Sequence, residues 1–173
     1  IDKYNLVHLS TGDIFRANIK GETELGKLAK SYIDKGELVP DEVTIGMLES
    51  EVDSNPNAEG FIFDGFPRTT PQAEALEVFL QNKGTEISVM MALAVAEEEL
   101  IKRLLLRGKD SGRADDQDES IIANRIKVYN EQTAVVADFY SAQNKFQKVD
   151  GVGTIDEIFN RLCSAIDEHK VSL

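Results

Sequence analysis

Apolar and polar residues alternate along the chain in blocks that predict strands and helices by turns. Short apolar runs predict strands at Asn5 to Leu9, in the FIFD stretch after Gly60, at Ile87 to Val95 and at Phe146 to Asp150. The run ISVMMALAV is apolar throughout, which favours a strand buried on both faces. Strands that alternate with helices predict a parallel sheet covered by helices on both faces, with ligands at the carboxyl ends of the strands.

Helical spacing of apolar residues fills the segments between these runs. The expected helices are Asp13 to Gly36 in two pieces broken near Gly21, a stretch opened by Pro40 and Asp41, Thr70 to about Lys83, Glu97 to Gly108, Ser120 to Gln143 and Ile155 to His169. Thr70 and Pro71 are typical of a cap followed by a first helical turn. The polar turns STGD, DGFPR and DGVG each follow a predicted strand, so we expect them to form the functional edge of the sheet.

Composition excludes several classes of protein. A length of 173 residues favours one domain, and a net charge of -12 argues against general binding to nucleic acid or to an anionic membrane. No apolar run of membrane-spanning length and no secretory leader is visible, so we expect a cytoplasmic protein. The single cysteine, Cys163, lies in an apolar pattern and is expected to be a buried core thiol, which leaves no thiolate cluster for zinc.

Five of the seven arginines fall at or beside Gly-containing turns. These are Arg16, Arg68, Arg107, Arg113 and Arg125, whereas Arg103 and Arg161 lie inside ordinary amphipathic helices. The rigid guanidinium fork suits phosphate oxygens, so phosphate binding is one interpretation. Ion pairing with the abundant Asp and Glu is the other, and charge alone does not decide between them.

The stretch GETELGKL, from Gly21 to Leu28, is close to the Walker A pattern of phosphate-binding loops. A working loop follows a strand and has Ser or Thr after its lysine. Here the preceding residues are helical in pattern, Leu28 takes the hydroxyl position, and Glu22 and Glu24 would place negative charge beside a polyphosphate. We therefore predict a junction between two helices, with Lys27 on the surface.

Five stretches together resemble the adenylate kinase family, the nucleoside monophosphate kinases that move a phosphoryl group between ATP and AMP. They are LVHLSTGDIFR, KGELVPDE, GFIFDGFPRTTPQAEAL, RLLLRGKDSGRADD and KVDGVGTIDEIF, in the family's order over Leu6 to Phe159. The resemblance implies an α/β fold, a three-layer doubly wound parallel sheet of the P-loop kinase type. Within this single domain it implies a small helical AMP-binding subdomain (residues 10–53) and a short lid (residues 108–118), with Gly108 and Gly112 as lid hinges.

The resemblance also implies the site residues. The AMP site would comprise Thr11, Arg16, Val39, Gly65, Phe66, Pro67, Arg68, Gln72, Arg113 and Arg125. ATP would be contacted by Arg107 and Gly153, and the catalytic set would be Arg68, Arg107, Arg113, Arg125, Asp64, Asp115 and Asp116, with Asp64 near the magnesium and its waters. Gln72 can offer a donor and an acceptor to the adenine edge, and without the resemblance it would be a solvated helix position. The partners implied are ATP, AMP, ADP and Mg²⁺ with ATP, in a monomer without lid zinc.

Some assignments have alternatives in the sequence itself. Asp115 and Asp116 could cap the long helix, Arg125 could pair with an acid on its own helix, and the Arg113 to Arg125 spacing is one residue longer than the commonest family form. His8 and His169 are expected to be structural or exposed. Phosphoryl transfer requires positioning and charge neutralisation and needs no histidine base.

Family members begin with a strand, the Walker A loop and most of a helix, whereas this chain begins at a stretch that resembles the end of that helix. We therefore expect the true N-terminus to precede Ile1, and the strands of this chain to flank a gap where the first strand lies. A UMP/CMP-type kinase is an alternative, although it usually carries Ala at the place of Thr11 and Asn at the place of Thr69. A non-catalytic nucleotide-binding remnant is the other.

Overall fold

A computed structural model describes residues 1–171, and the side chains of residues 1–169. Strands and helices alternate, as the sequence pattern predicts. The order is β1 (Val7–Ser10), α1 (Thr11–Lys20), α2 (Glu24–Ile33), α3 (Asp41–Asp53), β2 (Phe61–Asp64), α4 (Thr70–Asn82), β3 (Met90–Ala94), α5 (Glu97–Ser111), a 3-10 turn (Ala114–Asp116), α6 (Glu119–Val128), a π-helical turn (Tyr129–Thr133), α7 (Val135–Ser141), β4 (Phe146–Asp150) and α8 (Ile155–Val171).

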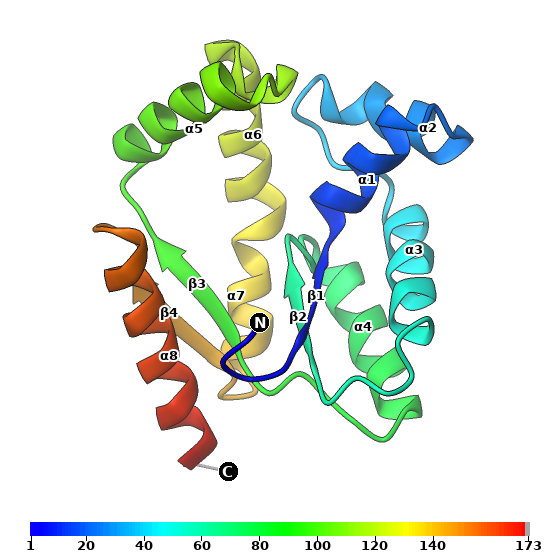
Figure 1. The fold of residues 1–173 in the computed structure, drawn as a ribbon, viewed down its shortest axis with the longest axis vertical. Coiled ribbons are helices and arrows are strands. Elements are labelled where there is room, and N and C mark those ends of the chain that lie inside the picture. The colour runs from blue at the N-terminus through cyan, green and yellow to red at the C-terminus, as the bar shows by residue number, and fades with distance from the viewer. Residues whose placement is uncertain (172–173) are drawn as a thin grey trace.

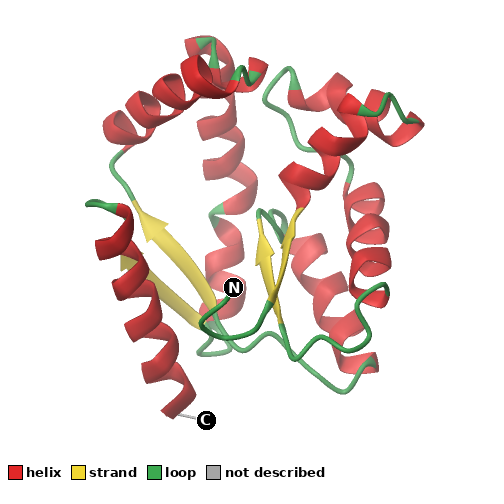
Figure 2. Cartoon of the chain, in the orientation of Figure 1, coloured by secondary structure: helices red, strands yellow, loops and turns green. Residues whose placement is uncertain are grey.

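The four strands form two parallel pairs. β1 pairs with β2 in the register Val7↔Phe61 to Ser10↔Asp64, and β3 pairs with β4 from Met90↔Phe146 to Ala94↔Asp150. Among the described residues the two pairs are not hydrogen-bonded to each other, so they form two separate two-stranded sheets. Figure 1 shows β1, β2 and β3 running toward the end of the molecule where α1 and α5 lie, and Figure 2 shows helices around both pairs. The α/β class with parallel strands is confirmed.

Separate apolar clusters hold the two pairs in place. Leu9, Leu48, Phe66 and Leu76 belong to a core that joins β1 and the loop after β2 to α3 and α4. A second cluster of Phe15, Ala29 and Val39 packs α1 against α2 and the segment before α3. A third packs Ala73 of α4 against Val136 and Tyr140 of α7, with Met90 and Phe146 of the second strand pair beside them. Helix α7 therefore lies between the strand pairs and links their cores.

The GETELGKL stretch is a junction between helices, as predicted. Gly21 ends α1, and the Thr23 side chain caps α2 by accepting from the Gly26 N–H at 3.0 Å. Lys27 is exposed and pairs with Glu24 at 2.6 Å. A Cβ on Gly26 would lie 2.1 Å from the Asn18 carbonyl oxygen, so this glycine lets α2 cross close to α1.

Four details differ from the sequence prediction. The cap of α4 is Thr69 rather than Thr70, because the Thr69 hydroxyl accepts the Gln72 N–H. The predicted Ser120 to Gln143 helix contains a π-helical turn at Tyr129–Thr133. The segment KDSGRADDQDES, between the expected helices that end at Gly108 and begin at Ser120, is largely helical: α5 continues to Ser111, Gly112 turns the chain at φ +67°, and a 3-10 turn and the start of α6 follow. The prediction that the third strand is buried on both faces is wrong: Leu93 is 49% exposed, because β3 pairs with β4 alone among the described strands.

The burial of Cys163 and the apolar character of the helices were both predicted from the sequence. Cys163 is buried in α8, which confirms the core thiol. Within residues 1–171, none of the helices combines the length and the apolar character needed to cross a membrane.

Candidate active site

The first part of the site is the corner where β1 and β2 end side by side. Ser10 and Asp64 are the last residues in register, and Thr11 and Gly65 follow them. Thr11 is buried and its hydroxyl donates to the Gly65 carbonyl at 3.0 Å, while Arg68 Nε donates to the same carbonyl at 2.8 Å. Gly65 has φ +71°, and a Cβ there would lie 2.7 Å from the Arg68 guanidinium. Glycine is therefore required for the turn that brings Arg68 back over the strand ends.

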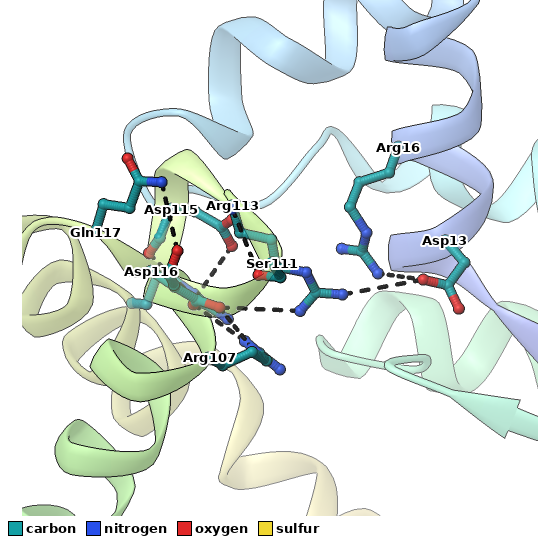
Figure 3. Close-up of polar contacts among 10 residues, drawn as sticks. Asp13, Arg16, Arg107, Ser111, Arg113, Asp115, Asp116 and Gln117 are labelled. Carbon is teal, nitrogen blue, oxygen red and sulfur yellow. Dashed lines mark hydrogen bonds and ion pairs between the residues drawn. The ribbon is translucent and has the colours of Figure 1, made fainter.

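Five arginines from five segments gather beyond this corner. Arg16 comes from α1, Arg68 from the loop after β2, Arg107 from α5, Arg113 from the residue before the 3-10 turn and Arg125 from α6. Figure 3 shows the Arg113 guanidinium between Asp13, which Arg16 also contacts, and Asp116, which Arg107 contacts. Burial lowers the pKa of Arg68, and the nearby positive charges of Arg125 and Arg16 lower it further. Burial also lowers the pKa of Arg113, and the positive charges of Arg16 and Arg107 lower it further.

These shifts have two physical causes, burial first and the neighbouring positive charges second. Guanidinium groups are held close together in partly dehydrated surroundings, where like charges repel strongly. An anion placed among them would remove that repulsion. The cluster is therefore suited to a group with several negative oxygens.

Asp116 neutralises and orients three of these arginines. Its side chain is fully buried and accepts Arg107 Nε at 2.5 Å, Arg107 Nη2 at 3.0 Å and Arg125 Nη1 at 2.5 Å. Arg113 lies 4.0 Å away as a weaker partner. Burial alone would raise the pKa of Asp116, but Arg107 and Arg125 outweigh it and hold the pKa below its ordinary value. Asp116 is thus a fixed negative charge at the base of the arginine cluster.

Two further acids, Asp115 and Asp13, also pair with arginines of the cluster. Asp115 pairs with Arg125 at 3.1 Å, and Asp13 pairs with Arg16 at 2.5 Å and with Arg113 at 4.0 Å. The Arg16 guanidinium holds the pKa of Asp13 below its ordinary value. The alternative in which Asp115 and Asp116 cap the long helix is wrong, because Asp118 accepts the first N–H groups of α6.

Arg125 joins the cluster despite its longer spacing from Arg113. It pairs with Asp115 and Asp116, which precede its helix, and not with an acid on the helix itself. The two interpretations of the arginines from charge alone are therefore compatible. Among the described residues the ion pairs of Arg107 and Arg125 use only part of each guanidinium group, so they do not exclude a further anion.

Three of the residues expected around AMP, Val39, Phe66 and Gln72, are buried. Gln72 is only 2% exposed, which excludes a solvated helix position, and its Oε1 accepts the Arg68 N–H at 2.7 Å. Val39 and Phe66 are buried with their side chains in apolar clusters, so any contact they make with a ligand involves backbone. Pro67 follows Phe66 through a cis peptide bond.

The loop after β4 carries Gly153, at φ +134°. Two arginines that the sequence analysis placed in ordinary helices hold this loop. Arg103 donates to the Gly151 carbonyl at 2.9 Å, and Arg161 donates to the Asp150 and Val152 carbonyls at 3.1 and 2.5 Å. Nothing in the helical pattern signals these contacts, because the partners lie 9 to 48 residues away in sequence.

The sequence analysis also missed a contact between His8 and Asp64. Its Nε2 lies 3.1 Å from Asp64 Oδ2 across the paired ends of β1 and β2. The side chain of Asp64 is 61% exposed. His8 lies opposite Ile62 in the register, so its side chain meets Asp64 diagonally across the strand pair, and that register was not readable from either strand alone.

Comparison with known proteins shows the family of this chain. Residues 1–145 match the family model described as adenylate kinase. This chain belongs to the adenylate kinase family. Members of the family are phosphotransferases, which agrees with a site built from arginines and carboxylates around the ends of parallel strands.

Curated adenylate kinases match almost the whole chain. The adenylate kinase of Flavobacterium psychrophilum is 60% identical over 96% of this chain and 87% of its own length. That of Parabacteroides distasonis is 55% identical over 98% of this chain and 89% of its own length. That of Bacteroides fragilis is 53% identical over 96% and 88%.

Proposed function

We propose that this protein is an adenylate kinase that transfers the terminal phosphoryl group of MgATP reversibly to AMP, giving two molecules of ADP. The observation that carries the proposal is the arginine cluster, in which Asp116 and Asp115 hold Arg107 and Arg125 at the ends of parallel strands. Phosphoryl transfer needs in-line positioning and neutralised charge on the moving oxygens, and fixed guanidinium groups supply both. The family and its named relatives support the same reaction.

In this proposal the AMP phosphate meets Arg16 and Arg68, beside Thr11 and Gly65. The shared carbonyl of Gly65 supports it, because it fixes the Thr11 hydroxyl and the Arg68 side chain relative to each other. The remaining AMP contacts would be made by Val39, Phe66, Pro67, Gln72, Arg113 and Arg125. The last two would close over the phosphoryl group as it moves between the nucleotides.

ATP would lie on the side of Arg107 and Gly153. The loop held by Arg103 and Arg161 supports a fixed backbone position at Gly153. Residues 10–53 would act as the AMP-binding subdomain and residues 108–118 as the lid. Within this lid, Asp116 bonds to Arg107 of α5 and to Arg125 of α6.

Magnesium fits this site as an ion that arrives with ATP. No group of three metal-ligating side chains exists among the described residues, and Asp64 is a single exposed carboxylate at a strand end. Mg²⁺ is commonly held by one or two carboxylates together with substrate phosphates and waters, and Asp64 suits that role. When bound, the ion would offset charge on the ATP phosphates. The side chains of this protein would orient the two nucleotides and exclude water between them.

A coupled assay of ADP formation with the full-length protein tests the proposal. AMP, UMP and CMP are each offered with MgATP at equal concentrations. We expect AMP to be the fastest acceptor, because Thr11 and Thr69 occupy places where UMP/CMP-type kinases usually have other residues. Faster turnover of UMP or CMP would replace the proposal with that alternative, and no transfer to any acceptor would favour a nucleotide-binding remnant.

The proposal also includes a monomer that acts in the cytoplasm. Light scattering of the full-length protein and fractionation of the cells that make it measure these two properties. A dimer, or recovery with membranes, would contradict them.

A further inference from the structure

The side-chain amide of Gln72 is held at both ends. Its Oε1 accepts the backbone N–H of Arg68 at 2.7 Å, and its Nε2 donates to Asp41 Oδ1 at 2.8 Å. A backbone N–H can only donate and a carboxylate can only accept, so a single orientation of the amide satisfies both partners. An unrestrained glutamine would instead be able to exchange its oxygen and nitrogen by rotating through half a turn.

Asp41 is itself fixed by the start of α4. It is the first residue of α3, and its Oδ2 accepts the Thr69 hydroxyl at 3.1 Å. The same hydroxyl accepts the Gln72 backbone N–H at 3.3 Å as the cap of α4. The hydroxyl has one hydrogen and gives it to Asp41, so Asp41, Thr69 and Gln72 form a closed ring of hydrogen bonds.

The two bonds to the amide leave part of its capacity unused by the described side chains. One N–H of Nε2 and one lone pair of Oε1 remain, in a residue that is 2% exposed. Asp41 lies two residues after Val39, the residue expected beside the adenine. At such a dry position, a base whose edge does not match the remaining donor and acceptor would leave buried polar groups unpaired, which is costly.

We propose that Asp41 determines the base specificity of the acceptor nucleotide by locking the Gln72 amide in the orientation that fits a 6-aminopurine. Adenine presents an amino N–H and a ring acceptor at N1, which pair with Oε1 and Nε2 in that order. Hypoxanthine presents a carbonyl oxygen and an N1–H, which require the reverse order. The inference rests on the proposed function, since it assumes AMP as the acceptor, and it assigns to Asp41 a positioning role.

The test compares AMP with IMP, which differ only at this edge of the base. The ratio of kcat/KM for AMP to kcat/KM for IMP is measured for the full-length protein and for Asp41→Asn, whose side chain has the same shape but can face the amide with either an acceptor or a donor. We expect the ratio to fall about 10-fold, because Nε2 of Gln72 then faces a neutral partner that can donate as well as accept, which weakens one of the two hydrogen bonds that fix the amide and leaves only the Arg68 N–H. The matched control is Glu42→Gln, which removes a charge from the same first turn of α3 at an exposed position and should leave the ratio unchanged.

The ratio is internal to each preparation, so a smaller folded fraction in a variant lowers both terms equally. A ratio in Asp41→Asn within twofold of the parent overturns the inference. So does an equal fall in Glu42→Gln, because it would show a general effect of charge at the start of α3. A parent protein that does not use AMP overturns the proposed function itself, which is a separate result.

Discussion

The Asp116 carboxylate receives the Arg107 guanidinium through two hydrogen bonds, of 2.5 and 3.0 Å, while its own side chain is completely buried. Arg107 reaches it from α5, nine residues earlier in the chain. Arg125 adds a third bond to the same carboxylate from α6. This buried charge is the point through which the two helices and the lid segment are joined.

Replacing Asp116 with Asn should therefore reduce both activity and stability. The amide keeps the shape but loses the charge that offsets the arginines, and its NH₂ group would face guanidinium donors. We expect kcat/KM to fall at least 10-fold and the free energy of unfolding to fall by about 1–3 kcal/mol, less than for a fully buried ion pair because Arg107 is 43% exposed. Kinetics and urea denaturation at pH 7 measure the two effects. Unchanged stability would show that the arginines do not depend on this charge.

The same substitution has a predicted pH dependence. The pKa of Asp116 is lower in the folded protein than its ordinary value of about 3.9. A carboxyl group with a depressed folded pKa stabilises the protein fully above the unfolded value, and this contribution is lost as the pH falls toward the folded value. The difference in unfolding free energy between the parent and Asp116→Asn should thus be constant from pH 7 to 5 and shrink below pH 4. A difference that grows toward low pH would contradict the ion pairing.

Substitution by alanine should have opposite effects on stability at two helical glycines, Gly108 and Gly46. A Cβ on Gly108 would lie 2.4 Å from the Asp116 carbonyl oxygen, whereas a Cβ on Gly46 would meet nothing within 4 Å. Alanine favours a helix over glycine by about 1 kcal/mol, so Gly46→Ala should stabilise the protein by roughly 0.5–1 kcal/mol. Gly108→Ala should destabilise it and lower activity, since Asp116 must move. Thermal unfolding compares them, and stabilisation by both would show that α5 does not need the close approach.

Arg68→Ala should abolish most turnover and leave the fold intact. Arg68 lies near Arg16 and Arg125. Its Nε bonds to the Gly65 carbonyl, and its two Nη atoms make no hydrogen bond to the residues that the structure describes, so they can meet an anion. Loss of one donor aimed at developing charge typically costs 10²- to 10³-fold, and we expect a fall of about 100-fold or more in kcat. Arg68→Lys is the control that keeps the charge and loses the fork, and it should recover only part of the rate. Near-normal activity of Arg68→Ala would show that the site assignment is wrong.

The hydroxyl groups of Tyr140 and Tyr4 should contribute differently to the stability of the protein. Tyr140 is 2% exposed, its hydroxyl has no hydrogen-bond partner among the described residues, and burial raises its pKa to about 12. The Tyr4 hydroxyl contacts the Cys163 carbonyl at 3.1 Å and Asp167 at 2.7 Å. Tyr140→Phe should be neutral or stabilising by up to about 1 kcal/mol, and Tyr4→Phe should destabilise by roughly 0.5–1.5 kcal/mol. Thermal unfolding should show the difference as a gap of a few degrees, and a destabilised Tyr140→Phe would mean that its hydroxyl is satisfied.

The sequence pattern predicted the order of strands and helices because apolar periodicity and turn residues are local signals. It also singled out the five arginines that the structure brings together, since each lies at or beside a Gly-containing turn or in a motif that resembles the family. It could not predict Asp41 as the partner of Gln72, or the approach of Gly108 to Asp116. Those contacts join residues 31 and 8 positions apart whose distance depends on how two elements cross. The cap at Thr69 was misplaced by one residue, because two adjacent threonines precede Pro71 and only the geometry distinguishes them.

The most direct test of the central claim follows the phosphoryl group itself. ATP labelled with ³²P at its terminal phosphate is incubated with AMP, Mg²⁺ and the full-length protein, and the nucleotides are separated. The account predicts that the label appears in the β-phosphate of ADP formed from AMP, with an equal amount of unlabelled ADP formed from ATP. Label released as inorganic phosphate, or no transfer of label from ATP to ADP at early times, would contradict it.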